Sequence, residues 1–294
     1  MKNVMVLIVN PARPTLDRGT IEAAVRMLRA GGASVGQPDW LAPGVACDIP
    51  FDGPALSEAM TGVDAVIVPA ARRRKKLLVA DMESTMIENE MLDELADFLG
   101  LRQKISGITA RAMNGEVDFV GALRERVALL KGLSVARLDE AARRIRYTPG
   151  GATLVATMKM HGAFCALVSG GFNYFTRMVR ERLGFDTDSA NTLGHDGRTL
   201  SGDVESPILG REAKLATLQR LGAEHGIPLE QTLAVGDGAN DVPMLVAAGL
   251  GVAFRAKPAV AAQVSTHIDH GDLTALLYLQ GYRQSEFARD PARP

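Results

Sequence analysis

Three apolar segments of this 294-residue sequence are each followed at once by polar residues that could take part in chemistry. If the segments are parallel strands, their carboxyl ends meet at one edge of a sheet, which is where open α/β sheets bind ligands. Taken singly, each group of polar residues that follows a segment could be a turn or a helix cap. The segments, each with the residues that follow it, are Leu77–Ala80 with Asp81 and Glu83, 164–168 with Ser169-Gly170-Gly171-Phe172, and 232–235 with Gly236-Asp237-Gly238-Ala239-Asn240-Asp241.

The carboxylates of Asp81, Glu83, Asp237 and Asp241 would gather at that edge. Their mutual repulsion would be costly without a cation, and hard oxygen ligands in this number suit Mg²⁺. A bound metal would also allow an anionic nucleophile to approach an anionic phosphate. The combination therefore predicts a magnesium site for phosphate chemistry.

The segment Ser169-Gly170-Gly171 and Lys214 could bind the phosphate itself. Two glycines allow backbone N–H groups to close around an oxyanion at the start of a helix. Lys214, early in a predicted helix, could supply positive charge, although by itself it would be a surface lysine in most proteins.

The elements that carry these residues alternate in the manner of an α/β fold. Apolar strand segments separated by helical segments predict a doubly wound parallel sheet over residues 77–284. Apolar residues at three- and four-residue spacing predict a helical insert at about 88–150. A segment rich in Gly, Asp, Asn and Thr, 185–204, predicts a hairpin or flap, and 285–294 a flexible tail.

The pattern of residues 1–71 predicts a separate α+β domain. This part of the sequence contains no group of side chains that would suit catalysis. The expected order is strand 4–9, helix 20–30, a Gly- and Pro-rich connection, helix 56–60 and strand 65–68. The basic run 72–76 is interpreted as a solvated linker.

Bulk properties limit the partners. Lys and Arg total 33 against 34 Asp and Glu, and a formal net charge of −1 predicts no general attraction for nucleic acid or membranes. Small molecules are the expected partners. With only Cys47 and Cys165 and an N-terminal apolar run too short for a secretory core or membrane span, a reducing, cytoplasmic location is expected.

The motifs, taken together, resemble those of the haloacid-dehalogenase-like (HAD) phosphatases in order and spacing. Within these, Glu90 and the segment 119–127 are similar to the pattern of the phosphoserine phosphatases. The resemblance covers about residues 75–280. Residues 1–71 resemble ACT-like regulatory domains, which would implicate an amino-acid effector or a homodimer.

The resemblance implies hydrolysis of O-phospho-L-serine, the last step of serine biosynthesis, in two stages. Asp81 would attack phosphorus and become an aspartyl-phosphate, while Glu83 would act first as acid and then as base. Mg²⁺ would be held by the Asp81 side chain, the Glu83 carbonyl and Asp237, supported by Asp241 and Asn240. The implied substrate contacts are Ser169, Gly170, Lys214 and Asn240 for the phosphoryl group, Glu90 for the ammonium, Arg126 for the carboxylate, and Met113 and Phe119 for the apolar side of the cap.

One residue departs from the family pattern, which usually has Asp where this sequence has Glu83. The extra methylene moves the carboxyl group by about 1.5 Å. We expect Glu83 to keep the acid/base role; the alternative is a carboxylate that serves only the metal. Two broader alternatives are a sensor of phosphate or metal without turnover, and an enzyme for another phosphate ester.

Overall fold

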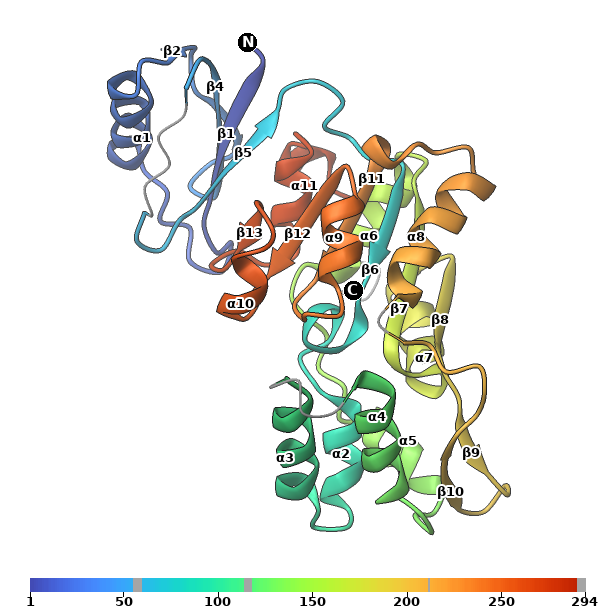
Figure 1. Cartoon of the computed structure of the whole chain (residues 1–294). Coiled ribbons are helices and arrows are strands. Elements are labelled where there is room, and N and C mark those ends of the chain that lie inside the picture. Colours follow the sequence, from blue (N-terminus) through green and yellow to red (C-terminus); the bar gives the residue numbers. More distant parts are fainter. Residues whose placement is uncertain (55–59, 114–117, 211, 290–294) are drawn as a thin grey trace.

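The computed structural model describes residues 1–54, 60–113, 118–210 and 212–289, and of Ala110, Ala112 and Met113 the backbone alone. It contains an N-terminal antiparallel sheet, a six-stranded parallel sheet, and a helical cap (Figure 1). The cap and the N-terminal domain lie at opposite ends of the parallel-sheet domain. In the part of the chain so described, no helix has both the length and the apolar character needed to cross a membrane.

The N-terminal sheet has the strand order β2-β4-β1-β5, with β3 paired to β4. Helix α1 covers one face, where Leu28 packs among inward-facing side chains such as Met5 and Ile49. The predicted first strand, first helix and last strand are confirmed, but the predicted connection contains three strands. The predicted helix at 56–60 falls largely outside the described residues. The elements are β1 Asn3–Ile8, α1 Arg18–Ala30, β2 Ser34–Val35, β3 Asp39–Ala42, β4 Ala46–Asp52 and β5 Asp64–Pro69.

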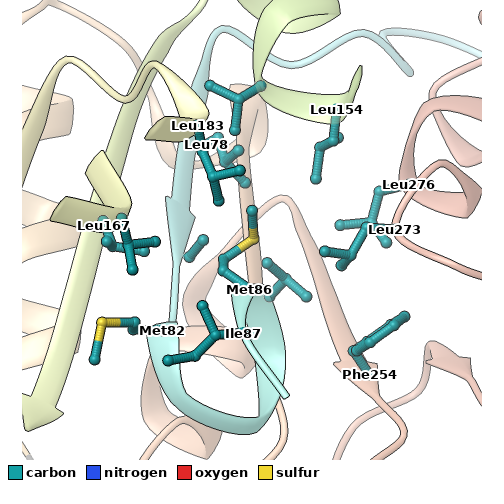
Figure 2. Packing of buried hydrophobic residues seen from close by; sticks show 14 of the residues in the cluster. Leu78, Met82, Met86, Ile87, Leu154, Leu167, Leu183, Phe254, Leu273 and Leu276 are labelled. Atoms are coloured by element: carbon teal, nitrogen blue, oxygen red, sulfur yellow. The ribbon is translucent and has the colours of Figure 1, made fainter. Parts of the chain in front are cut away.

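The parallel sheet has the order β13-β12-β11-β6-β7-β8, which confirms the predicted doubly wound α/β class. Helices α8 and α9 pack on one face through side chains such as Leu218 and Met244. Helices α6, α7 and α11 pack on the other, where Leu154 and Leu276 belong to the same buried cluster as Leu78 (Figure 2). The elements are β6 Leu77–Ala80, α6 Gly151–Met160, β7 Phe164–Phe172, α7 Asn173–Leu183, β8 Thr187–Asn191, α8 Ala213–Glu224, β11 Thr232–Gly236, α9 Val242–Ala247, β12 Leu250–Phe254, α10 Pro258–Ala261, β13 His267–Ile268 and α11 Ala275–Leu279.

The cap is inserted between β6 and α6, as the spacing of apolar residues predicts. Its four helices lie within the predicted range of about 88–150, and a two-stranded hairpin with its turn at 196–199 lies beside α4. The predicted flap segment thus supplies the hairpin, but it also supplies β8, which belongs to the main sheet. The elements are α2 Met91–Asp97, α3 Arg102–Met113, α4 Phe119–Ala128, α5 Ala136–Ala142, β9 Leu193–His195 and β10 Leu200–Val204.

The N-terminal sheet is docked on the parallel-sheet domain by its second face. Its apolar side chains, Val6 among them, belong to the same buried cluster as Leu277 of α11. The buried carboxylate of Asp64 accepts backbone N–H groups of residues 269–271, at 2.8 Å for Gly271. The two domains therefore share both an apolar core and a polar contact.

The basic run 72–76 takes part in this docking. Arg73, whose side chain is 11% exposed, pairs with Asp48 of the N-terminal sheet and donates to the carbonyls of Tyr278 and Leu279 on α11. A guanidinium can do this because it carries five donors in a fixed fork. The interpretation of this run as a solvated linker is therefore wrong for Arg73.

The chain continues in ordered structure past the predicted start of the tail. Residues Gln284–Glu286 form a 3₁₀ turn, and Phe287 packs against the main core. Glu286 also pairs with Arg74 at 2.7 Å. The predicted flexible tail is therefore wrong for the described residues 285–289.

Candidate active site

The carboxyl ends of β6, β7 and β11 open into one pocket of about 1100 Å³ beneath the cap. The parallel register sets Ala80, the last residue of β6, beside both Val235 and Leu167, so the residues that follow these three positions lie at the same edge of the sheet. The lining residues come from the sheet and the cap alike, and they include Asp81, Glu83, Ser84, Glu90, Asp93, Thr109, Phe119, Arg126, Gly170, Gly171, Asp237, Asn240 and Lys257.

Asp81 follows the last residue of β6 and begins an irregular turn over Met82–Met86. Met82, Met86 and Ile87 are fully buried in the main core, which fixes the turn from below (Figure 2). Ser84 adopts φ +56°, an uncommon conformation for a residue with a side chain. Alternation of buried apolar and outward polar residues thus turns Asp81 and Glu83 toward the pocket.

Three carboxylates and one ammonium form the floor of the site. One oxygen from each of Asp81, Asp237 and Asp241 lies within 4.8 Å of the others. Lys214 Nζ, from the first turn of α8, lies 2.7 Å from Asp81 Oδ1 and 2.5 Å from Asp241 Oδ1. The second oxygen of Asp241 accepts the Gly238 N–H at 2.9 Å, so Asp241 is held on both sides.

The electrostatics of this floor fit a divalent cation. Burial and the neighbouring Asp241 raise the pKa of Asp81 well above its usual value, and the same causes raise the pKa of Asp237 to about 6. Burial opposes the charge on Lys214, but Asp241 and Asp81 outweigh it and raise its pKa. Three carboxylates opposed by one ammonium leave an excess of negative charge, and oxygen ligands in this arrangement suit a hard cation.

Glu83 reaches away from the floor toward the cap. Its Oε1 accepts the N–H of Met91 at 2.7 Å, where α2 begins. Burial, and then the charge of Glu90, raise the pKa of Glu83 to about 8. A Cβ added to Gly171 would lie 2.6 Å from Glu83 Oε2, so the glycine leaves the space that this side chain occupies. The longer side chain is thus accommodated, and its raised pKa favours the protonated form.

The segment 169–171 forms the wall opposite Glu83. Ser169 is buried, and its Oγ accepts the Gly171 N–H at 2.9 Å. A Cβ on Gly170 would lie 3.0 Å from Cζ of Phe119, so the cap rests on the sheet domain at this glycine. Both glycines thus leave space for a neighbouring side chain, and neither has an unusual φ.

The cap side of the pocket carries a carboxylate and a guanidinium. Glu90 accepts from the Ser84 hydroxyl at 2.6 Å and is otherwise exposed to the pocket. Arg126 donates to the Ala122 carbonyl at 3.2 Å and to the Thr109 hydroxyl at 3.4 Å. Burial lowers the pKa of Arg126, whereas Glu83 and Glu90 raise it. This pair offers opposite charges to a small zwitterion.

The structure brings together nearly all the predicted site residues. Ser169, Lys214 and Asp241 are buried beside the pocket, and the side chain of Met113 lies outside the described residues. Sequence reasoning missed Ser84, which contacts Glu90, and Lys257, which follows the end of β12 by three residues. The strand-end rule that found Asp81 could also have found Lys257.

Comparison with known proteins matches residues 78–246 to the model of the haloacid dehalogenase-like hydrolases. The phosphoserine phosphatase of Streptomyces coelicolor is 44% identical over 235 residues, which are 79% of this chain and 57% of that protein. The phosphoserine phosphatase of Lactococcus lactis is 43% identical over 203 residues, 69% of this chain and 94% of that protein. The chain thus spans little more than half the length of the first relative, and about two thirds of the chain match nearly all of the second.

The structural comparison extends over the N-terminal domain as well. A solved HAD-family hydrolase of Salmonella enterica serovar Typhi superposes with a TM-score of 0.81 at 28% identity. The match covers 94% of this chain and 98% of the Salmonella protein. The two-sheet arrangement with an inserted cap is therefore shared with a known structure.

Proposed function

Because the chain belongs to the haloacid dehalogenase-like hydrolases, we propose that it is a Mg²⁺-dependent phosphoserine phosphatase. It hydrolyses O-phospho-L-serine to L-serine and inorganic phosphate. The observation that carries the proposal is the pocket itself. Buried Asp81 and Lys214 lie at its floor, and Glu90 and Arg126 lie on its cap side.

The two ends of this pocket match the two ends of the substrate. Glu90 pairs with the substrate ammonium, and Arg126 with its carboxylate, for which a planar guanidinium is well suited. Phe119, which touches Gly170, closes the apolar side over the substrate. The phosphoryl group then lies at the floor against Ser169, Gly170, Lys214 and Asn240.

The reaction uses two carboxyl groups in sequence. An oxygen of Asp81 forms a bond to phosphorus as the bond from phosphorus to the serine oxygen breaks, and protonated Glu83 gives its proton to that oxygen. Glu83, now ionised, takes a proton from water, whose oxygen attacks phosphorus and releases Asp81. Lys214 stabilises the negative charge on the phosphoryl oxygens throughout.

The residues present fit a magnesium ion beside Asp81. The side chains of Asp81 and Asp237 and the carbonyl of Glu83 would hold it, and Asp241 and Asn240 would support them. When bound, Mg²⁺ neutralises charge on the phosphate and on the attacking carboxylate. Burial and the neighbouring Asp241 raise the pKa values of Asp81 and Asp237, and a bound cation would favour their ionised forms.

The direct test is phosphate release from phosphoserine and a panel of other phosphomonoesters, with Mg²⁺ and with a chelator. We expect phosphoserine to be the best substrate and the chelator to abolish turnover. Phosphate or metal binding without any turnover would instead support the sensor alternative, and a better non-amino-acid ester would change the substrate.

Replacing Glu90 with Ala should reduce the preference for phosphoserine over other phosphate esters more than it slows phosphoryl transfer itself. A hydrogen bond to a charged group contributes about 1.5–3 kcal/mol, so kcat/KM for phosphoserine should fall by roughly 10- to 100-fold. An aryl phosphate has no ammonium and should lose much less. The measurement compares kcat/KM for both esters, with Glu88→Ala, an exposed neighbour paired with Arg146, as the control. Equal losses on both esters would remove Glu90 from substrate recognition.

Replacing Glu83 with Gln should slow turnover by roughly 10²-fold or more, because the amide has no proton to give and takes none from water. Gln keeps the length of the side chain and can still accept the Met91 N–H. Rapid-quench kinetics should show slow formation of the phosphoenzyme with phosphoserine. A good leaving group needs no proton, so an aryl phosphate should form it faster. A near-normal rate with phosphoserine would leave Glu83 as a metal-site carboxylate only.

The N-terminal domain has a supporting role in this proposal, as the site of an amino-acid effector or as a homodimer contact. Among its described residues, no group of three acidic, histidine or cysteine side chains could hold a metal. The two cysteines are free and buried, which supports a reducing, cytoplasmic location.

A further inference from the structure

We propose that Asn191, which lies outside every motif of the site, is a positioning residue that joins the two phosphate-binding segments of the protein. These segments are 169–171, in the bulged part of β7, and the start of α8, which carries Lys214. The inference rests on the proposed function, because both segments must bind a phosphoryl group for their alignment to matter.

The need for such a residue arises in the pairing of β7 with β8. Val168 lies opposite Ser189, and the next pair is Phe172 with Asn191. Four steps along β7 therefore correspond to two along β8, so residues 169–171 bulge out of the ladder. A bulge lets the phosphate-binding segment leave the sheet, but it also deprives the Gly170 carbonyl of a strand partner.

The side chain of Asn191 takes the place of that partner. It is 1% exposed, and its Nδ2 donates to the Gly170 carbonyl at 2.9 Å. The C=O of Gly170 and the N–H of Gly171 belong to one trans peptide and point in opposite directions. The N–H donates to Ser169 Oγ, so Asn191 fixes a peptide plane that in turn orients the serine hydroxyl. With this lone pair occupied, the Ser169 O–H remains available to a phosphoryl oxygen.

The same amide also holds the second segment. Asn191 Oδ1 accepts the Leu209 N–H at 2.7 Å, and Nδ2 lies 3.4 Å from the Leu209 carbonyl. Gly210 follows directly, and its carbonyl accepts the N–H of Ala213, the residue before Lys214. One buried amide thus connects the Ser169 wall to the start of the helix that carries Lys214.

Loss of this amide should weaken the binding of any phosphate ester to a similar extent. The Gly170 carbonyl and the Leu209 N–H would lose their buried hydrogen-bond partner, so phosphate affinity should fall about tenfold. The expected effect differs from that of Glu90→Ala, which should weaken only the binding of the substrate ammonium. A merely structural role would lower the active fraction, and so kcat, without changing phosphate affinity or KM.

The experiment measures inorganic phosphate binding by calorimetry in Mg²⁺, together with KM and kcat for phosphoserine and an aryl phosphate. Asn191→Ala removes all the contacts, whereas Asn191→Asp keeps the size and the acceptor for Leu209 but loses the donors. The control is Asn173→Ala, whose amide donates to Thr192 at 2.8 Å on the same side of the sheet. Circular dichroism establishes that each variant is folded.

We expect both Asn191 variants to lose about tenfold in phosphate affinity, with KM raised equally for both esters and the control unchanged. Wild-type affinity in folded Asn191→Asp, or an equal loss in the control, would overturn the inference while leaving the proposed function in place. Wild-type protein that neither binds phosphate nor hydrolyses any phosphomonoester would overturn both.

Discussion

Replacing Asp81 with Asn should lower turnover of phosphoserine by at least about 10³-fold, because an amide cannot serve as the nucleophile. Labelled substrate quenched in acid should leave covalent phosphate on the wild-type protein and none on the variant. Asp196→Asn, the same change in the exposed turn of the β9–β10 hairpin, is the control and should retain activity. Substantial turnover or covalent label in the Asp81 variant would contradict direct attack by this residue.

The same variant should be more stable than the wild type when no metal is present. Burial and Asp241 raise the pKa of Asp81, so ionised Asp81 destabilises the fold at neutral pH. The amide removes that charge, and Lys214 keeps Asp241 as its partner. The stability gained from protonated Asp81 is present at low pH and lost as pH rises, so the difference in unfolding free energy between variant and wild type should increase with pH. Urea denaturation of both proteins in the presence of a chelator, at several pH values, measures this difference in unfolding free energy.

Replacing Lys214 with Met should damage both activity and stability. The ammonium lies within hydrogen-bonding distance of Asp81 and Asp241, and its side chain is 4% exposed. Methionine fills a similar volume but leaves two carboxylates buried without this partner. Removing one member of a buried ion pair costs about 3–5 kcal/mol, so the midpoint of urea unfolding in a chelator should fall sharply.

Adding Mg²⁺ distinguishes the loss of stability from the loss of activity in Lys214→Met. The ion neutralises the carboxylates and should restore part of the stability, since a ligand that binds only the native state stabilises it. Activity should remain at least about 10³-fold below wild type, because the charge that stabilises the phosphoryl oxygens is missing. Lys104→Met, on the exposed face of α3, is the control. A variant as active as the wild type would place the phosphate away from Lys214.

The ends of the parallel strands were predictable because two signals agree there. The apolar run of β6 and the polar residues after it predict both a buried strand and a site at its end, and β7 and β11 repeat the pattern. The topology of a parallel sheet places the carboxyl ends of all its strands at one edge. Residues that are distant in sequence could therefore be assigned to one site without knowledge of the distances between them. The fold class and most of the pocket follow from this rule.

Asn191 and strand β4 were missed because they depend on tertiary contacts that leave no periodic signal in the sequence. Asn191 lies in a segment whose Gly, Asp and Asn content predicts a turn, and its role depends on a bulge in the neighbouring strand. Strand β4 contains Pro50 and two aspartates, which local propensity disfavours in a strand, yet it pairs with β1 over residues 46–51. In both cases a partner strand decides the structure.

The contact between Arg73, Asp48 and α11 determines what kind of motion can pass between the two domains. A flexible tether would let the N-terminal domain swing as a separate body, but here the connecting residues are themselves fastened to both sides. Packed elements move past one another by small sliding displacements rather than by rotation about a hinge. Any displacement of the N-terminal domain would therefore reach the parallel-sheet domain as a shift of α11 against its sheet.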